Sequence, residues 1–311
     1  MTYSFDSPIF IVGLPRTGST LWLNIITRNP AVFGIGEMLV LTPLWRRDLR
    51  YFLKTQVGDL LERENVKRMV DLMFSGKRIP GISSSFWRYE VQAHDSPELK
   101  ERIVHRLQGT KPGPRTVFQA IIEEMPRHHG FSRCCVKFPV FVNHVPELVK
   151  WYPRCRVVHI IRDPRAMAIS RALFRGERRL RQRQLTILFA SLQYVWTSKV
   201  HDRLSSLPNY GLFRYEDLLA NPAGTIRDLC DFVEIEFRPQ MLEPYAGQAS
   251  SLTGTKSGGF NRKPGTHWTE AISPFEKCVI TALTRSSMRR FGYDPENHPI
   301  FLDSHVEPRP A

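Results

Sequence analysis

Short apolar runs alternate with longer stretches of helical pattern along much of this chain. The apolar runs are expected to be strands, at residues 8–12, 134–138, 156–161 and 210–214. Unbroken apolar runs of this length are typical of parallel strands that are covered on both faces. Helical patterns follow these strands, as between residue 19 and the Asn29-Pro30 pair. The alternation predicts an α/β fold with a mostly parallel central sheet.

A more polar and mainly helical region, from about residue 40 to residue 130, interrupts the strand pattern. We expect it to be an insertion over the active-site mouth of the sheet, where a substrate lid would lie. The last 18 residues contain four prolines, so an irregular tail is expected over about 294–311. No internal repeat and no clear break is visible. Residues 1–311 are therefore expected to form a single domain.

Composition excludes several classes of protein. The 311 residues are 42% hydrophobic and 24% charged, which is ordinary for a globular protein. No apolar run approaches the roughly 18 residues that span a bilayer, and residues 8–12 are too short for a signal peptide. Five cysteines without a Cys-x-x-Cys pair indicate neither a disulfide framework nor a zinc site. We expect a cytoplasmic protein with reduced thiols and no metal.

Positive charge exceeds negative charge by a wide margin. Lys and Arg number 44 against 30 Asp and Glu, so the formal net charge is +14. Such an excess attracts nucleic acid, acidic lipid or a small polyphosphate ligand. Five arginines between residues 175 and 183 contribute to it. They are interpreted either as part of a solvated helix or loop, or as a binding surface for an anionic acceptor, a lipid headgroup or an acidic peptide.

The loop after the first predicted strand, residues 13–20, is a candidate phosphate site. In a strand–loop–helix turn, backbone N–H groups and the positive helix end converge on one point. The loop has the spacing of the Walker pattern G-x-x-x-x-G-K-[ST], but Ser19 stands where the lysine should be. The alternative is a turn whose glycines serve geometry only. Arg16, Ser19 and Thr20 together favour phosphate binding.

A second candidate anion site follows the third predicted strand. Arg162 lies at its carboxyl end, where the ligands of open α/β sheets gather. Ser170 follows eight residues later, about two helical turns on, and can share a face with Arg162. Together they could bind a second phosphate. Taken singly, they could equally be an ion-pair residue and an ordinary helix hydroxyl.

Four segments, in order, resemble the motifs of the sulfotransferases that use 3′-phosphoadenosine 5′-phosphosulfate (PAPS). Residues 15–20 resemble the 5′-phosphosulfate loop, and residues 161–170 resemble the 3′-phosphate motif with its Arg-to-Ser spacing. Residues 260–268 are similar to the loop that closes over the nucleotide, and residues 215–218 to the segment with an adenine-contacting tyrosine. The resemblance covers most of the chain. It implies a P-loop-like, three-layer α/β fold.

The resemblance also implies a reaction, namely in-line transfer of a sulfuryl group from the co-substrate PAPS to a hydroxyl or amine, without a metal. It assigns PAPS binding to ten residues: Arg16, Thr17, Gly18, Ser19, Thr20, Arg162, Ser170, Tyr215, Arg262 and Lys263. The expected acceptor is a small molecule, a carbohydrate, a lipid or a peptide, and no nucleic-acid partner is expected. Peripheral membrane contact is compatible with the sequence.

Sulfuryl transfer needs cations that stabilise charge on the departing oxygen, and Arg16 and Lys137 are the candidates. Many members of the family have lysine at the position of Arg16. Lys137 lies within the apolar run 134–138, which resembles the family's central lysine-containing strand. The alternative for Lys137 is a lysine at a strand end that reaches solvent.

The reaction also needs a general base, and Glu37 is the candidate. In the small-molecule cytosolic branch a histidine stands two residues after the strand lysine, but here Pro139 occupies that position. A branch that includes protein-tyrosine and some carbohydrate sulfotransferases uses a glutamate shortly after the first helix, and residues 29–37 resemble that segment. The alternative for Glu37 is an acid at a helix N-terminus. His94 and His267 are reserve candidates.

Two other functions compete with this interpretation. A P-loop small-molecule kinase would bind ATP with magnesium, but Ser19 in place of the lysine argues against it. A non-catalytic protein that binds nucleic acid or other anions through the arginines at 175–183 would show a steep salt dependence. That function leaves the order of the four motifs unexplained.

Overall fold

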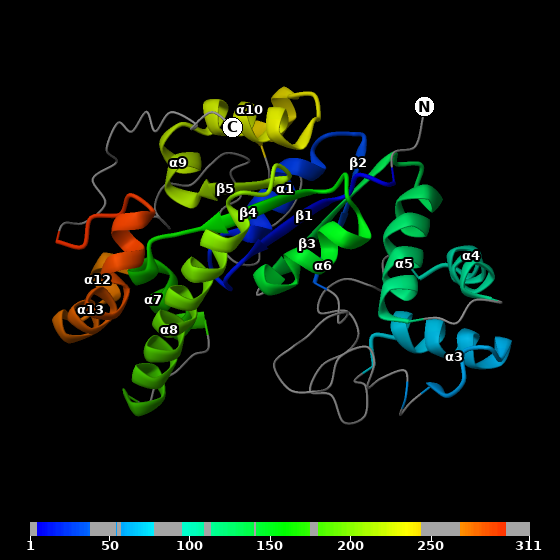
Figure 1. The fold of residues 1–311 in the computed structure, drawn as a ribbon, viewed down its shortest axis with the longest axis horizontal. Coiled ribbons are helices and arrows are strands. Elements are labelled where there is room, and N and C mark those ends of the chain that lie inside the picture. The colour runs from blue at the N-terminus through cyan, green and yellow to red at the C-terminus, as the bar shows by residue number, and fades with distance from the viewer. Residues whose placement is uncertain are drawn as a thin grey trace. The chain divides into compact units, whose positions relative to one another are not determined.

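A computed structural model describes residues 5–37, 54, 57–77, 95–108, 113–139, 141–174, 180–243 and 268–296. Its strands form one five-stranded sheet in the order β2-β3-β1-β4-β5 (Figure 1). They are β1 (Ile9–Gly13), β2 (Val32–Ile35), β3 (Arg133–Pro139), β4 (Arg156–Ile161) and β5 (Tyr210–Arg214). β2 is parallel to β3, and β4 is parallel to β5. The predicted α/β fold with a mostly parallel sheet is confirmed.

Four of these strands lie where the apolar runs predicted them. β4 and β5 have the predicted bounds, and the bounds of β1 and β3 differ from the prediction by one residue at each end. The apolar runs did not reveal β2, because it has only four residues with a glycine among them. Its register with β3 places Val32 opposite Arg133 and Ile35 opposite Val136.

The chain divides into two compact units. The first contains Met1–Phe10 and Pro30–Cys155, and the second contains Ile11–Asn29 and Arg156–Ala311. The expectation of a single functional domain over residues 1–311 stays a prediction.

In the first unit, helices stack one on the next. α3 (Arg63–Phe74) packs on α4 (Pro97–Leu107), α4 packs on α5 (Pro114–His128), and α5 packs on β3. α6 (Val145–Trp151) follows the short 3-10 segment η4 (Phe141–His144). The predicted helical character of the region around residues 40–130 is thus confirmed for its described part. Its role as a lid stays a prediction.

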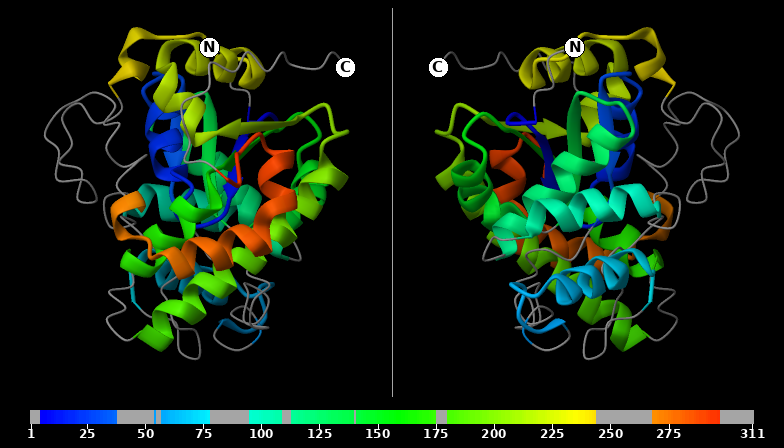
Figure 2. Two further views of the ribbon diagram at one scale, coloured as in Figure 1. Left: turned by 90° about the vertical axis from the view of Figure 1, so that its left-hand side faces the viewer. Right: turned by 90° about the vertical axis from the view of Figure 1, so that its right-hand side faces the viewer.

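In the second unit, four helices that follow the phosphate loop in the chain pack together. α7 (Pro164–Phe174) and α13 (Pro274–Arg290) both pack on α8 (Leu180–Leu204), and α12 (Trp268–Ala271) packs on α7. The left view of Figure 2 shows α13 lying across α8. The other elements of this unit are α1 (Ser19–Thr27), α9 (Tyr215–Ala220), α10 (Pro222–Val233) and η5 (Pro239–Leu242).

Buried apolar strands form the framework of each unit. Every residue of β1 is buried, as are the last five residues of β4. This burial explains why the strands appeared in the sequence as unbroken apolar runs. Among the helices that the structure describes, none is both long enough and apolar enough to cross a bilayer.

Candidate functional site

Two glycines shape the loop between β1 and α1, in the second unit. Gly13 has φ +152° and Gly18 has φ +91°, a region of backbone conformation that favours glycine. A Cβ atom on Gly13 would lie 2.5 Å from the carbonyl oxygen of Ile160, and one on Gly18 would lie 2.5 Å from Cδ2 of Tyr215. Both positions therefore require glycine for conformation and for space.

The loop leads directly into the N-terminus of α1. Gly18 is the N-cap residue, and its carbonyl accepts a hydrogen bond of 2.8 Å from the backbone N–H of Leu21. Thr17 is buried, and its hydroxyl donates to the carbonyl of Leu14 at 2.8 Å. Ser19 is the first residue of α1, and no acidic residue lies in the first turn. This helix end suits an anion, because its N–H groups and its dipole are not countered by a carboxylate.

Arg16 adopts an unusual backbone conformation in this loop. Its φ of +76° is rare for a residue other than glycine, and such strain is concentrated at functional sites. Its Nε donates a hydrogen bond of 3.1 Å to Oγ of Ser170, and its guanidinium lies 4.7 Å from the ring centroid of Phe174. Side chains of α7 thus hold the loop arginine.

Arg162 completes this cationic group at the carboxyl end of β4. It is buried, and its Nη1 donates to the carbonyl oxygen of Arg16 at 3.2 Å. Its guanidinium lies 4.5 Å from the ring centroid of Tyr215. The first two candidate anion sites, one around Arg16 and one around Arg162 and Ser170, therefore form one continuous group, which we call the cationic patch.

Tyr215 is the first residue of α9, and its side chain packs against this patch. Its ring contacts both Gly18 and Arg162 and is buried. Burial raises the pKa of the phenol, although the charges of Arg162 and Arg16 lower it in part. The adenine contact that the resemblance implies for Tyr215 stays a prediction.

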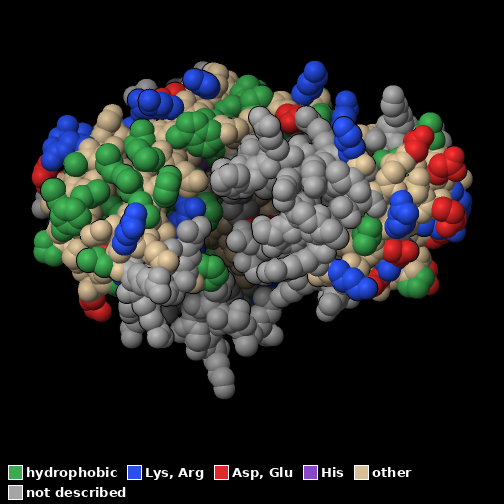
Figure 3. All heavy atoms as spheres, turned by 90° about the horizontal axis from the view of Figure 1, so that it is seen from below, with side chains coloured by type: hydrophobic (Ala, Val, Ile, Leu, Met, Phe, Trp, Pro, Cys, Tyr) green, Lys and Arg blue, Asp and Glu red, His purple; other side chains and the backbone are tan. Residues whose placement is uncertain are grey.

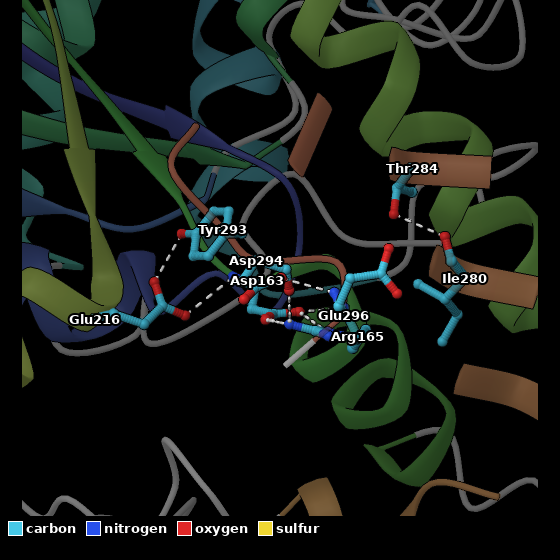
Figure 4. Close-up of polar contacts among 8 residues, drawn as sticks. All are labelled: Asp163, Arg165, Glu216, Ile280, Thr284, Tyr293, Asp294 and Glu296. Carbon is cyan, nitrogen blue, oxygen red and sulfur yellow. Dashed lines mark hydrogen bonds and ion pairs between the residues drawn. The ribbon is translucent and has the colours of Figure 1, made fainter. Parts of the chain in front are cut away.

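Buried charges fix the start of α7, and the sequence did not single them out (Figure 4). The carboxylate of Asp163 accepts from the backbone N–H of Arg165 at 2.8 Å and forms an ion pair of 2.7 Å with its guanidinium. Arg165 also donates to the carbonyl of Asp294 at 3.0 Å. Both side chains of the pair are fully buried. The only sequence signal was the position of Asp163 before Pro164, which suits a helix start.

Glu216 connects this network to α9. One carboxylate oxygen accepts from the backbone N–H of Asp163 at 3.0 Å, and the other accepts from the hydroxyl of Tyr293 at 2.7 Å (Figure 4). Burial raises the pKa of Glu216, while the hydrogen bond from Asp163 lowers it. The ring of Trp268, the last residue of the segment that resembles the nucleotide-closing loop, has its centroid 5.4 Å from the guanidinium of Arg165. Residues that follow β4 and β5 are therefore locked together.

In the first unit, Glu37 and Lys137 form an ion pair with Nζ and Oε1 3.2 Å apart. The strand register explains the contact. Because Ile35 pairs with Val136, Glu37 leaves the carboxyl end of β2 beside Lys137 on β3. Both side chains are largely buried. Glu37 comes two residues after the end of β2. The parallel pairing of β2 with β3 therefore brings it to Lys137.

Several candidate residues lie outside the part of the chain that the structure describes. They are His94, Arg175, Arg178, Arg179, Arg262, Lys263 and His267. Within the described residues, no group of three or more His, Cys, Asp and Glu side chains is arranged to hold a metal ion. Transfer without a metal stays a prediction.

The fold and the cationic patch define the class of protein: an α/β protein whose strand–loop–helix turn has the geometry of a phosphate or sulfate site. Comparison with family models narrows this class. Residues 8–239 match the model described as "Sulfotransferase family". The chain therefore belongs to the sulfotransferase family, and it is an enzyme of that family.

Solved structures support the same fold at low sequence identity. The sulfotransferase domain of the olefin synthase from Synechococcus PCC 7002 is 17% identical, with a TM-score of 0.59 over 94% of this chain and 98% of that one. The sulfotransferase domain from the curacin biosynthetic pathway is 16% identical, with a TM-score of 0.57 over 93% and 98%. No curated protein matches the sequence.

Proposed function

We propose that this protein transfers a sulfuryl group from PAPS to a hydroxyl or amine of an acceptor. The observation that carries the proposal is the cationic patch, in which Arg16 from the first motif contacts both Arg162 and Ser170 from the second. Two guanidinium groups and a helix N-terminus at one place suit a ligand that carries several negative charges.

The fit of PAPS to these residues can be judged from the loop. Arg16 is held in a strained conformation, and the N-terminus of α1 has no acid in its first turn. In the proposal, residues 16–20 bind the 5′ end of PAPS, and Arg162 and Ser170 bind its 3′-phosphate together with Arg262 and Lys263. Bound PAPS supplies the sulfuryl group and a leaving group that carries the negative charge.

Glu37 is proposed as the general base and Lys137 as a catalytic cation. Glu37 accepts the acceptor's proton as that oxygen or nitrogen bonds to sulfur. Lys137 and Arg16 stabilise the charge that develops on the bridging oxygen as its bond to sulfur breaks. Arg16 acts through charge alone, because a guanidinium does not release its proton near neutral pH. The support for these two roles is the ion pair that orients the Glu37 carboxylate.

Thermal unfolding tests the nucleotide part of the proposal. Adenosine 3′,5′-bisphosphate (PAP) keeps both phosphate ends of PAPS, so at about 100 times its Kd it should stabilise the fold by roughly 2.7 kcal/mol. For a chain of 311 residues, that raises the Tm by about 4 °C. ATP with magnesium should change the Tm little. Equal shifts from the two nucleotides would contradict the proposal.

The transfer itself is tested by incubating the protein with an isotopically labelled PAPS and panels of phenols, steroids, sugars, lipids and peptides. Appearance of label on one class of acceptor supports the proposal and identifies that class. If no acceptor is labelled and no PAP is released, in a protein that PAP stabilises, the protein binds the nucleotide without transfer. Release of PAP with free labelled sulfate would mean that the sulfuryl group goes to water and not to these classes of acceptor.

A further inference from the structure

One face of α8 is apolar and exposed over most of the helix. Leu185, Leu188, Phe189, Leu192 and Trp196 follow the spacing of a single helical face, and each is between 37% and 59% exposed. We call these five residues the α8 face. Figure 3 shows hydrophobic side chains gathered on the side of the second unit where α8 and α13 lie.

The buried face of α8 is mixed in character. It contains Ser and Thr hydroxyls at Thr186, Ser191, Thr197 and Ser198 beside the apolar or aromatic residues Ile187, Ala190, Tyr194, Val200 and Leu204. A helix on a water-facing surface normally has apolar residues on its buried face alone, with polar residues on the other. Exposed apolar clusters of this kind mark sites of interaction with another protein or a membrane. We therefore expect the α8 face to be covered by a binding partner.

Charge distinguishes between the possible partners. Between residues 180 and 201 the sequence has no acidic residue, and exposed Arg181 and Lys199 lie near the two ends of the α8 face. Exposed Arg203 follows, and the single acid of α8, Asp202, is paired with Arg290. The rim of the α8 face is thus basic at both ends.

A second copy of the chain is a poor match to this rim. In a two-fold dimer with antiparallel α8 helices, the basic N-terminal end of one helix would face the basic C-terminal end of the other. A parallel arrangement would bring Arg181 beside its own copy. Like charges repel in both arrangements, whereas a negatively charged surface would be attracted at both ends.

We propose that the α8 face docks on a membrane surface that is rich in anionic phospholipid. Its apolar side chains enter the region between headgroups and acyl chains, and Arg181 and Lys199 contact lipid phosphates. Trp196 suits this position, because its ring is apolar and its indole N–H is polar. None of these residues belongs to the cationic patch, so this proposal does not depend on the proposed function.

Vesicle sedimentation tests the proposal. The protein should sediment with vesicles of equal parts phosphatidylcholine and phosphatidylglycerol, much less with phosphatidylcholine alone, and less as salt is added. The double variant Phe189→Ser, Leu192→Ser should weaken binding at least tenfold. The matched control is Leu61→Ser, which removes an apolar side chain that is 61% exposed in the first unit. It should bind as the wild type does.

The basic rim is tested separately. Arg181→Gln with Lys199→Gln should also weaken binding at least tenfold and should reduce its salt dependence, whereas Arg115→Gln, at an exposed position in the first unit, should not. All the altered side chains are exposed, so each variant should melt within about 1–2 °C of the wild type. With brominated lipid, tryptophan quenching should be lost in Trp196→Phe.

Three outcomes would overturn the proposal. The first is no sedimentation with anionic vesicles. The second is equal binding by the wild type and the Phe189→Ser, Leu192→Ser variant. The third is a wild-type dimer in size-exclusion chromatography that this variant converts to a monomer, because the α8 face would then be an interface between copies.

Discussion

Replacing Gly18 by alanine should damage the phosphate loop in a way that the structure allows to be worked out. The backbone at this position has φ +91°, and a new Cβ would lie 2.5 Å from Cδ2 and 2.7 Å from Cε2 of Tyr215. Carbon atoms in contact are normally about 3.5–4.0 Å apart. The ring would therefore have to move by about 1 Å, or the loop would have to open.

The free-energy cost has two sources. A left-handed backbone costs a residue with a Cβ about 1–2 kcal/mol. Moving the ring of Tyr215 also weakens its contact with the guanidinium of Arg162, 4.5 Å away, which is worth about 0.5–1 kcal/mol or more. Together they amount to about 2 kcal/mol, which lowers the Tm of a chain of 311 residues by about 3 °C. If half of this cost opposes binding, the Kd for PAP rises about fivefold, and if all of it does, about thirtyfold.

Differential scanning fluorimetry and calorimetric titration with PAP measure both effects. Gly113→Ala is the matched control, because Gly113 has φ −114° and a Cβ there would meet nothing within 4 Å. The control should keep the wild-type Tm and Kd. The reasoning would be refuted if Gly18→Ala matched the control in both quantities, since the loop would then not depend on the contact with Tyr215.

Further predictions distinguish nucleotide binding from catalysis and test how the unfolding free energy depends on pH. Arg162→Ala should weaken PAP binding by at least tenfold. Glu37→Gln keeps an oxygen for Lys137, so it should leave the Kd for PAP nearly unchanged while kcat falls about 100-fold or more. Full activity of this variant would exclude Glu37 as the base. Burial lowers the pKa of His159 from 6.5 to about 3, so the fold favours its neutral form. This stabilisation is present above pH 6.5 and is lost toward pH 3, at roughly 1.4 kcal/mol per pH unit. His159→Gln should flatten that part of the pH profile of unfolding free energy, and exposed His105→Gln should not.

Strands were predictable from sequence wherever burial left a continuous apolar run. β1 and β4 are covered on both faces, so their sequences carry the signal directly. β2 carries no such signal, because four residues with a glycine fit a loop equally well. Its existence depends on pairing with β3, and such a long-range contact is not encoded in local pattern.

The contacts within the cationic patch were only partly predictable. Arg16 and Ser170 are separated by 154 residues, and no spacing rule connects them. The sequence placed them in two separate candidate anion sites, and only the resemblance to one family assigned both sites to a single ligand. The ion pair of Lys137 with Glu37 likewise needed the register of β2 on β3.

The buried pair of Asp163 and Arg165 was missed because charged residues in a sequence are ordinarily assigned to the surface. Its burial is informative. A fully buried ion pair contributes little net stability, since desolvation offsets most of the attraction. We infer that the pair acts by position. Asp163 accepts from the backbone N–H of Arg165 and its own backbone N–H donates to Glu216, so the first turn of α7 is fixed to α9.

Arg162 immediately precedes this fixed turn, and Ser170 lies further along the same helix. A shift of α7 would therefore move Ser170 away from the Nε of Arg16 and Arg162 away from the Arg16 carbonyl, contacts of 3.1 and 3.2 Å. Hydrogen bonds of that length weaken steeply with small displacements. The patch thus owes its geometry to buried residues that need not touch the nucleotide.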